Sequence, residues 1–193
     1  MSSDTETGRL GKIEFLAMNN PVRRLLMKYV EFRICRRLLE NNHIDLTGKI
    51  ILDAGCGSGY STELIMDTFR PAKLMAFDLM PEQIRLAKRR SVSADFFVAD
   101  MTNLDLPDAT VNAVFIFGVL HHIPKWPAAI QELTRTLRGD GVLLVEEPHS
   151  RFGWSEFEHS IESAGLTIIG KQTFCFGNFH NYLCQRINHK GSA

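Results

Sequence analysis

Short apolar runs that alternate with helical patterns are the feature that most narrows the fold of this chain. The runs comprise residues 50–54, 73–77, 96–98, 111–117 and 142–145, and helical patterns over residues 61–69, 81–90 and 126–137 lie between them. Continuously apolar strands that alternate with helices indicate a parallel sheet with helices on both faces. The sequence therefore predicts an α/β fold with a doubly wound sheet and right-handed crossovers.

Two further segments flank this alternating core. Upstream, Asn20 and Pro21 are typical of a helix start. Apolar residues then recur at helical spacing, at Val22, Leu25, Leu26, Tyr29, Phe32 and Leu39. Downstream, we expect a helix near residues 154–164 and an antiparallel hairpin of residues 166–174 and 179–186. We expect one domain over residues 1–193, with an N-terminal helical segment (1–47) and a sheet core (48–193).

The composition excludes several classes of protein. The 193 residues suit one domain, and the balance of 22 basic against 22 acidic residues argues against a nucleic-acid partner. No apolar run approaches the roughly 18 residues that a membrane span needs. The cysteines Cys35, Cys56, Cys175 and Cys184 lie far apart, which argues against a metal site and for reduced thiols in the cytoplasm.

A glycine-rich turn stands where the first predicted strand meets the following helix. It reads Asp53-Ala-Gly55-Cys-Gly57-Ser-Gly59, and Tyr60 occupies the position where the dinucleotide fingerprint requires glycine. The Gly-Lys-Ser/Thr ending of a phosphate-binding P-loop does not occur there either. Glycines at such a junction let the backbone turn tightly and approach a ligand. Because the carboxylate of Asp53 would repel a pyrophosphate, the turn favours a cationic ligand.

Two more acids follow the second and third predicted strands. Asp78 comes 23 residues after Gly55, at the place where an acid in dinucleotide-binding folds accepts the ribose hydroxyls. Asp100 ends the next strand, where it can accept from an adenine amino group. In open α/β sheets the ligand crevice lies at the carboxyl ends of the strands, so we expect Asp53, Asp78 and Asp100 to face it together.

In combination, these motifs resemble class I S-adenosylmethionine-dependent methyltransferases, and most of all the small-molecule branch (type 11) that includes quinone-biosynthesis enzymes. The motifs that carry the resemblance are residues 52–59, 78–79, 99–101, 117–123 and 137–145, and the match runs from about Lys49 to Pro148. It implies a Rossmann-like seven-stranded sheet ordered 3-2-1-4-5-7-6 with its last strand antiparallel. It also implies S-adenosylmethionine as cofactor, S-adenosylhomocysteine as product, and methyl transfer by in-line displacement to a small-molecule acceptor.

The resemblance also assigns cofactor-binding roles. The full set is Asp53, Gly55, Cys56, Gly57, Gly59, Asp78, Leu79, Asp100, Met101, Phe117 and Gly118. Asp53 would lie near the methionine part of the cofactor, above the glycine backbone and bordered by Phe117 and Gly118. Asp78 would bind the ribose hydroxyls, Leu79 would pack on adenine, and Asp100 with the Met101 N–H would bind the adenine edge. The chain departs from the family at Asn112 and at Gly139-Asp-Gly141, where Asp and Pro-Gly-Gly are usual; neither place touches the cofactor.

Three histidines are candidates for a catalytic base. His121 and His122 follow the fourth predicted strand, and His149 follows the fifth. Histidine titrates near neutral pH and can take a proton from an acceptor. The alternative is that each one bonds to neighbouring backbone. Glu146 and Glu147, which end the fifth strand, would line an acceptor pocket or merely cap the strand.

The N-terminal helical segment is basic. Residues 9–42 carry eight Lys or Arg against three Glu. A solvated helix face explains this charge, and contact with an anionic acceptor or membrane surface is the alternative. We also expect the segment to form a lid over the acceptor site, because an isolated helix of this length is marginal in water and needs a partner surface.

A second class of function stays open at this stage. The same residues would suit a non-catalytic module that binds S-adenosylmethionine or S-adenosylhomocysteine as a regulator or scaffold. Aminopropyl transfer on the same fold is a further alternative, whereas a nicotinamide oxidoreductase is excluded by Tyr60. The sequence identifies neither the acceptor nor the oligomeric state.

Overall fold

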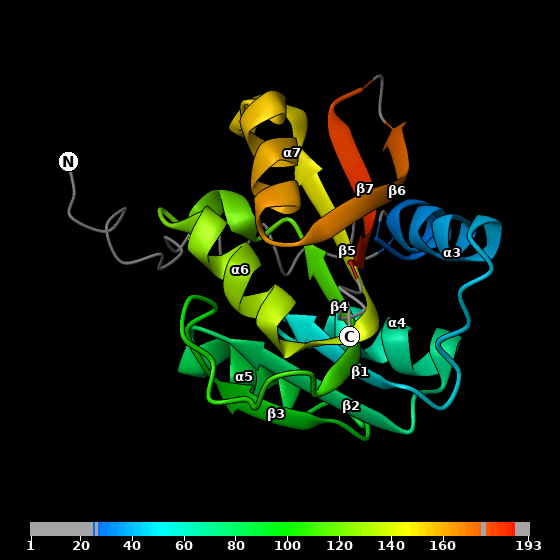
Figure 1. The fold of residues 1–193 in the computed structure, drawn as a ribbon. Coiled ribbons are helices and arrows are strands. Elements are labelled where there is room, and N and C mark those ends of the chain that lie inside the picture. Colours follow the sequence, from blue (N-terminus) through cyan, green and yellow to red (C-terminus); the bar gives the residue numbers. More distant parts are fainter. Residues whose placement is uncertain (1–24, 26, 175–176, 188–193) are drawn as a thin grey trace, which may run out of the picture.

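The strands of the described chain form one mixed sheet (Figure 1). The computed structural model describes residues 25, 27–174 and 177–187. In these residues the strands are β1 (Ile50–Ala54), β2 (Lys73–Asp78), β3 (Asp95–Val98), β4 (Val111–Phe117), β5 (Leu137–Pro148), β6 (Leu166–Phe174) and β7 (Phe179–Arg186). Their order is β3-β2-β1-β4-β5-β7-β6, which confirms the predicted order.

The direction of the strands also agrees with the prediction. Strands β1 to β5 pair in parallel, whereas β7 runs antiparallel to both of its neighbours, β5 and β6. Parallel neighbours need a crossover connection, but an antiparallel pair can be joined by a short turn. The few residues between Phe174 and Phe179 therefore make β6 and β7 a hairpin, and β7 closes the gap between β5 and β6.

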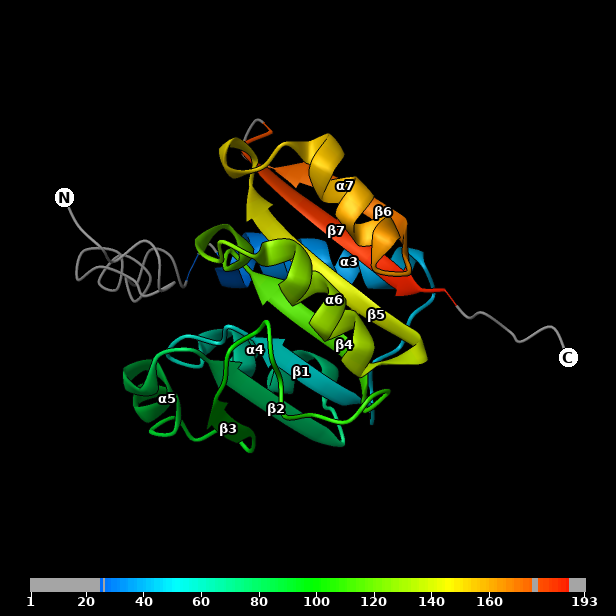
Figure 2. The same ribbon diagram turned by 60° about the vertical axis from the view of Figure 1, so that its left-hand side comes forward.

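Helices cover both faces of the sheet. They are α3 (Phe32–Asn41), α4 (Tyr60–Phe69), α5 (Pro81–Ala87), α6 (Trp126–Thr136) and α7 (Trp154–Ser163). Figure 2 shows α6 and α7 on one side of the sheet and α3 on the other. Side chains alternate across β2, so Leu74 joins the apolar cluster under α3 and α4, whereas Met75 joins the cluster under α6 and α7. None of the helices in the described residues is long and apolar enough to cross a membrane.

Strand β5 is longer than its apolar run indicates. The sequence predicts a strand over residues 142–145, but β5 begins at Leu137, which pairs with Val111. Gly139, Asp140 and Gly141 carry no apolar side chain, so a hydrophobic pattern does not reveal this part. The register shifts between Val111 and Ala113, and the intervening Asn112 accepts a hydrogen bond from Ile50 N at 3.0 Å. The unusual Asn112 therefore ties the start of β1 to β4.

The N-terminal segment departs from its predicted register. A π-helical turn, Met27–Glu31, precedes α3. Because a π-helix bonds each residue to the fifth one along, the residues before the turn are rotated away from the face that an α-helical pattern predicts. Tyr29 and Leu25, both expected on the apolar face, are each 56% exposed, whereas Glu31 is buried. Phe32 points inward as expected, with its ring 5.8 Å from Phe69 and 5.7 Å from Phe117. The apolar stripe thus holds from Phe32 onward and fails at Leu25 and Tyr29, whereas Val22 and Leu26 lie outside the described residues.

Part of the basic segment is a solvated face, as expected. Arg33, Arg36 and Arg37 are exposed on α3, and Arg36 pairs with Glu40 at 3.2 Å. Helix α3 itself packs on β6 and β7, and Leu38 lies beside Gly170 of β6. Most of the remaining N-terminal segment, residues 1–24 and 26, lies outside the described residues. The division into a lid and a sheet core, and contact with an anionic surface, stay predictions.

Replacing Phe32 tests how α3 is anchored. Phe32→Ala should lower the free energy of unfolding by about 3–5 kcal/mol, because it empties a site enclosed by three other aromatic rings. Tyr29→Ala, on the exposed side of the π-helical turn, should change it by less than about 0.5 kcal/mol. Urea unfolding of both variants measures the difference. Similar losses in the two variants would contradict the π-helical register.

Candidate functional site

The turn between β1 and α4 can be built only with glycine. Gly55, Gly57 and Gly59 have φ values of +77°, +52° and +81°, in the region that other residues rarely adopt. A Cβ atom on Gly55 would lie 2.7 Å from both methyl groups of Val119, in the loop after β4. The predicted glycine turn is therefore confirmed as a backbone feature, and it packs directly against the chain that leaves β4.

Asp78 joins this turn to the next helix. Its Oδ2 accepts from Gly57 N and its Oδ1 from Met80 N, both at 2.9 Å, and partial burial raises the pKa of the carboxyl. Leu79, the next residue, is a large apolar side chain that is 38% exposed beside it. A fixed carboxylate and an open apolar side chain thus lie together at the end of β2, as a nucleoside site would need.

Asp53 has a different environment from the one expected. Its side chain is 1% exposed, and its Oδ2 accepts from Ser61 Oγ at 2.7 Å and Thr62 Oγ1 at 2.6 Å. Both hydroxyls belong to the first turn of α4, so the carboxylate ties that helix to β1. Burial raises the pKa of Asp53 to about 6. Its contact with the methionine part of a cofactor stays a prediction.

The segment after β3 carries the residues expected at the adenine. Asp100 is exposed, and its Oδ1 accepts from the backbone N and the hydroxyl of Thr102, both at 2.8 Å. Met101 is buried in the core below it. Asp100 is therefore held in one place while its carboxylate stays open to a ligand.

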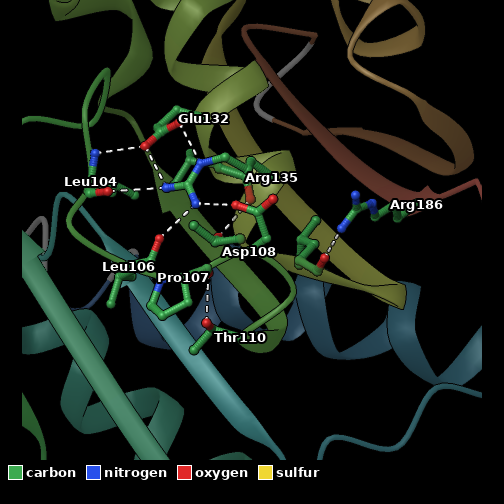
Figure 3. A network of polar contacts seen from close by, with 11 residues as sticks. Leu104, Leu106, Pro107, Asp108, Thr110, Glu132, Arg135 and Arg186 are labelled. Carbon is green, nitrogen blue, oxygen red and sulfur yellow. Dashed lines mark hydrogen bonds and ion pairs between the residues drawn. The ribbon is translucent and has the colours of Figure 1, made fainter.

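A network centred on Arg135 fastens the chain that follows this segment (Figure 3). From α6, Arg135 donates to Leu106 O at 2.7 Å, Leu104 O at 3.1 Å and Asp108 at 2.6 Å. Glu132, one turn earlier in α6, accepts from Arg135 at 2.7 Å and from Leu104 N at 2.8 Å. Neither residue was singled out from the sequence, because a charged pair three residues apart on a helix is usually a solvated pair.

The loop after β4 contains His121 and His122, whose ring centroids lie 3.9 Å apart. Glu147 is fully buried, and its Oε1 accepts from Val119 N at 2.8 Å and Leu120 N at 2.7 Å. Its Oε2 lies 2.7 Å from Nδ1 of His121, whose side chain is 11% exposed. Phe117 is buried against α3, and Gly118 (φ +64°) donates to Glu146 O. Glu147 therefore accepts from the loop backbone and also holds His121, and a role in lining an acceptor pocket stays a prediction.

His149 belongs to a separate aromatic cluster. Its Nδ1 lies 2.7 Å from Nε2 of His180, and Trp154 stacks on His180 with ring centroids 4.0 Å apart. Trp154 Nε1 also donates to His149 O at 2.9 Å. Burial and the nearby His149 lower the pKa of His180. No local pattern singles out His180, because only the pairing of β5 with β7 brings it to His149.

Comparison with known proteins identifies the family. The family model described as "Methyltransferase domain" matches residues 52–145, which include the glycine turn, Asp78, Asp100, β4 and most of β5. The chain belongs to the class I S-adenosylmethionine-dependent methyltransferases. The residues at the carboxyl ends of β1 to β5 include those that the sequence predicts for the cofactor and the acceptor, and these roles stay predictions.

Curated methyltransferases are similar in sequence to part of this chain. It is 30% identical over 134 residues to a fatty-acid O-methyltransferase of Mycolicibacterium smegmatis, covering 68% of this chain and 49% of the relative. It is 34% identical over 97 residues to a malonyl-[acyl-carrier protein] O-methyltransferase of Serratia marcescens, covering 50% of this chain and 37% of the relative. The chain thus spans about half of these relatives or less.

Solved structures confirm the methyltransferase fold. A S-adenosylmethionine-dependent methyltransferase from Aquifex aeolicus superposes with a TM-score of 0.75 at 17% identity, covering 93% of this chain and all of that one. At 17% sequence identity, this similarity is evidence for the fold alone. It agrees with the sheet order and the antiparallel β7 described above.

The described residues fit the cofactor of this methyltransferase family. The turn requires glycine at positions 55, 57 and 59, Asp78 is fixed beside it, and Leu79 and Asp100 are accessible. The full set of cofactor-binding residues stays a prediction. Among the described residues, no group of three or more His, Cys, Asp or Glu could hold a metal ion. Cys35, Cys56 and Cys184 are buried free thiols, and Cys175 lies outside the described residues.

The raised pKa of Asp53 predicts a pH dependence of stability. Its folded-state pKa of about 6 exceeds its unfolded value of about 3.9, so the native state binds more protons between these pH values. Stability from this group therefore falls as pH rises from about 4 to 6. Asp53→Asn removes this dependence, and the stability of the variant relative to wild type should rise by about 2–3 kcal/mol between pH 4 and 7.

Urea unfolding at several pH values measures this effect. Asp105→Asn is the matched control, because Asp105 is exposed in the loop after β3. The free energy of unfolding of Asp105→Asn should differ from that of wild type by the same amount at each pH. If the free energies of unfolding of Asp53→Asn and wild type differ by the same amount at every pH, burial does not raise the pKa of Asp53.

Proposed function

We propose that this chain binds S-adenosylmethionine and transfers its methyl group to a small-molecule acceptor. The single observation that carries the proposal is the arrangement around Asp78: a carboxylate fixed by Gly57 N and Met80 N, beside the exposed Leu79 and the glycine turn. Such a carboxylate can accept two ribose hydroxyls without further rearrangement, and Leu79 offers an apolar surface for adenine. The family supports the same cofactor.

The chain's part in the reaction is positioning. When bound, the cofactor supplies a methyl group on a positively charged sulfur. An in-line displacement at such a carbon needs the acceptor atom held about 3–3.5 Å away and water excluded. The buried Phe117 and the capped loop after β4 give this side of the crevice a rigid wall. Asp53 is withdrawn into the core, so its charge is kept from stabilising the sulfonium before the reaction.

The relatives favour an oxygen acceptor on an apolar molecule. Their names describe methylation of fatty acids, of malonyl-[acyl-carrier protein] and of phthiotriol or phenolphthiotriol dimycocerosates. We therefore propose a small-molecule or acyl-type acceptor in place of nucleic acid. A cytoplasmic location belongs to the same proposal. The alternative, a non-catalytic binding module, has no support among the relatives.

Asp78→Ala tests the nucleoside site. The variant should bind S-adenosylhomocysteine about 1.5–3 kcal/mol more weakly by calorimetry, because it loses hydrogen bonds to a charged group. Asp105→Ala, on an exposed loop, is the control and should bind like wild type. Thermal unfolding of both variants excludes a general loss of structure. Unchanged affinity in Asp78→Ala would place the ribose elsewhere.

Measuring methyl transfer distinguishes an enzyme from a non-catalytic binding module. Wild-type protein is incubated with methyl-labelled S-adenosylmethionine and, separately, octanoic acid, phenol and a long-chain alcohol, and labelled product is extracted. We expect label transfer to at least one acceptor, together with release of S-adenosylhomocysteine. Tight binding of S-adenosylhomocysteine without transfer to any acceptor would favour the non-catalytic alternative.

A further inference from the structure

We propose that His149 and His180 form a proton-sensitive latch, which holds the chain after β5 against β7 at neutral pH and releases it in acid. The inference goes beyond the proposed methyl transfer and does not depend on it. It starts from a contact between two imidazole rings, one on the 3-10 turn η4 (His149–Arg151) and one near the start of β7. That contact can hold one added proton but not two.

The chain that leaves β5 stays attached to β7 beyond the end of their ladder. The last paired residues of the two strands are Pro148 and Phe179. Beyond them, His149 N donates to Asn178 O at 2.7 Å, and Nδ1 of His149 lies 2.7 Å from Nε2 of His180. The contact between the two rings therefore continues the attachment past the last paired residues.

Trp154, the first residue of α7, joins both histidines. Its ring stacks on His180 with centroids 4.0 Å apart and planes 13° apart, and its Nε1 donates to His149 O at 2.9 Å. Because an aromatic face attracts a cation, this stacking favours one positive charge on the pair. The arrangement therefore tolerates the first proton, and the second proton sets its limit.

The number of protons on the pair explains why the contact fails in acid. In the neutral pair, one of the two facing nitrogens donates its N–H and the other accepts with its lone pair. One added proton leaves this arrangement intact, because an imidazolium can donate to a neutral ring. After a second proton, both facing nitrogens carry N–H, so no acceptor remains across the 2.7 Å contact and two like charges face each other. The doubly protonated pair must separate.

The two rings differ in exposure, which lets the latch respond to the solvent. His149 is exposed, whereas His180 is 8% exposed. Burial, followed by the nearby His149 and Lys171, lowers the pKa of His180. An exposed histidine titrates near pH 6.5, so the released chain takes up a second proton that the latched chain excludes. The population of the released form therefore rises as the pH falls below about 6.5.

Charged groups around the pair come from each element that packs against it. Lys171 of β6 and Glu158 of α7 form an ion pair at 2.5 Å, and Tyr182 Oη of β7 donates to the same carboxylate. Lys171 lowers the pKa of Glu158, and burial raises the pKa of Tyr182, so both groups titrate outside the range between pH 5 and 7. Glu147, opposite the buried histidine on β5, accepts from the loop after β4, and Arg151 of η4 is exposed. The protonation of the two histidines is therefore what changes at this contact in that range.

Hydrogen exchange of the Trp154 indole N–H measures release, because this group donates to His149 O in the latched state. Exchange in the full chain is followed by NMR from about pH 7.5 to 5, and protection is expressed relative to the intrinsic rate at each pH. In wild type, protection should fall about tenfold per pH unit below pH 6.5, because the released form holds one more proton. His149→Gln, whose amide oxygen can accept from His180 at any pH, should keep its protection constant. His159→Gln, on the exposed face of α7, is the control and should behave as wild type.

Two further readings distinguish release of the latch from other events. The backbone amide of Val145, inside β5, should keep its protection over the same pH range. In NMR titrations of the histidine rings, the wild-type pair should take up its two protons in steps more than about one pH unit apart. Constant protection of the Trp154 indole in wild type, or an equal fall in His149→Gln, would overturn the proposal. So would a parallel loss at Val145, or two rings that titrate independently.

Discussion

The close approach of the glycine turn to the loop after β4 is the constraint on which the site depends. Gly55 leaves no room for a side chain beside Val119, and this contact fixes how far β1 and β4 project at the carboxyl edge of the sheet. Two backbone N–H groups of the turn, from Gly55 and Cys56, donate to Phe77 O, so β2 is held in the same unit. The carboxyl ends of β1, β2 and β4, where we propose that the cofactor binds, are thus parts of one junction.

Three acids stabilise this junction in different ways. Asp53 ties α4 to β1, Asp78 ties the glycine turn to α5, and Glu147 ties the loop after β4 to β5. Desolvation of these carboxylates costs stability, and the hydrogen bonds from hydroxyl and backbone donors offset it. A fold stabilised only by apolar contacts would not need them. Their common place at the carboxyl ends of the strands indicates that part of the folding free energy is used to shape the site.

Most of the fold could be predicted because its signals are local. Apolar runs and glycine positions located the strands, and Pro81 marked the start of α5 correctly. The errors have physical causes. Tyr29 was expected inside because a π-helical turn is not visible in an apolar pattern. The start of β5 was missed because Gly139, Asp140 and Gly141 carry no apolar side chain.

In the candidate site, too, some features are encoded locally in the sequence and others depend on the tertiary structure. The sequence by itself determined the glycine turn, the acids after the strands and the family, because their spacing is encoded within short segments. Only the tertiary structure decided which way Asp53 points, which histidine is held by a carboxylate, and that His180 meets His149. These partners lie 8 to 31 residues apart along the chain, and sheet pairing and helix packing bring them together. Side-chain direction at such distances depends on register and burial, which no local pattern specifies.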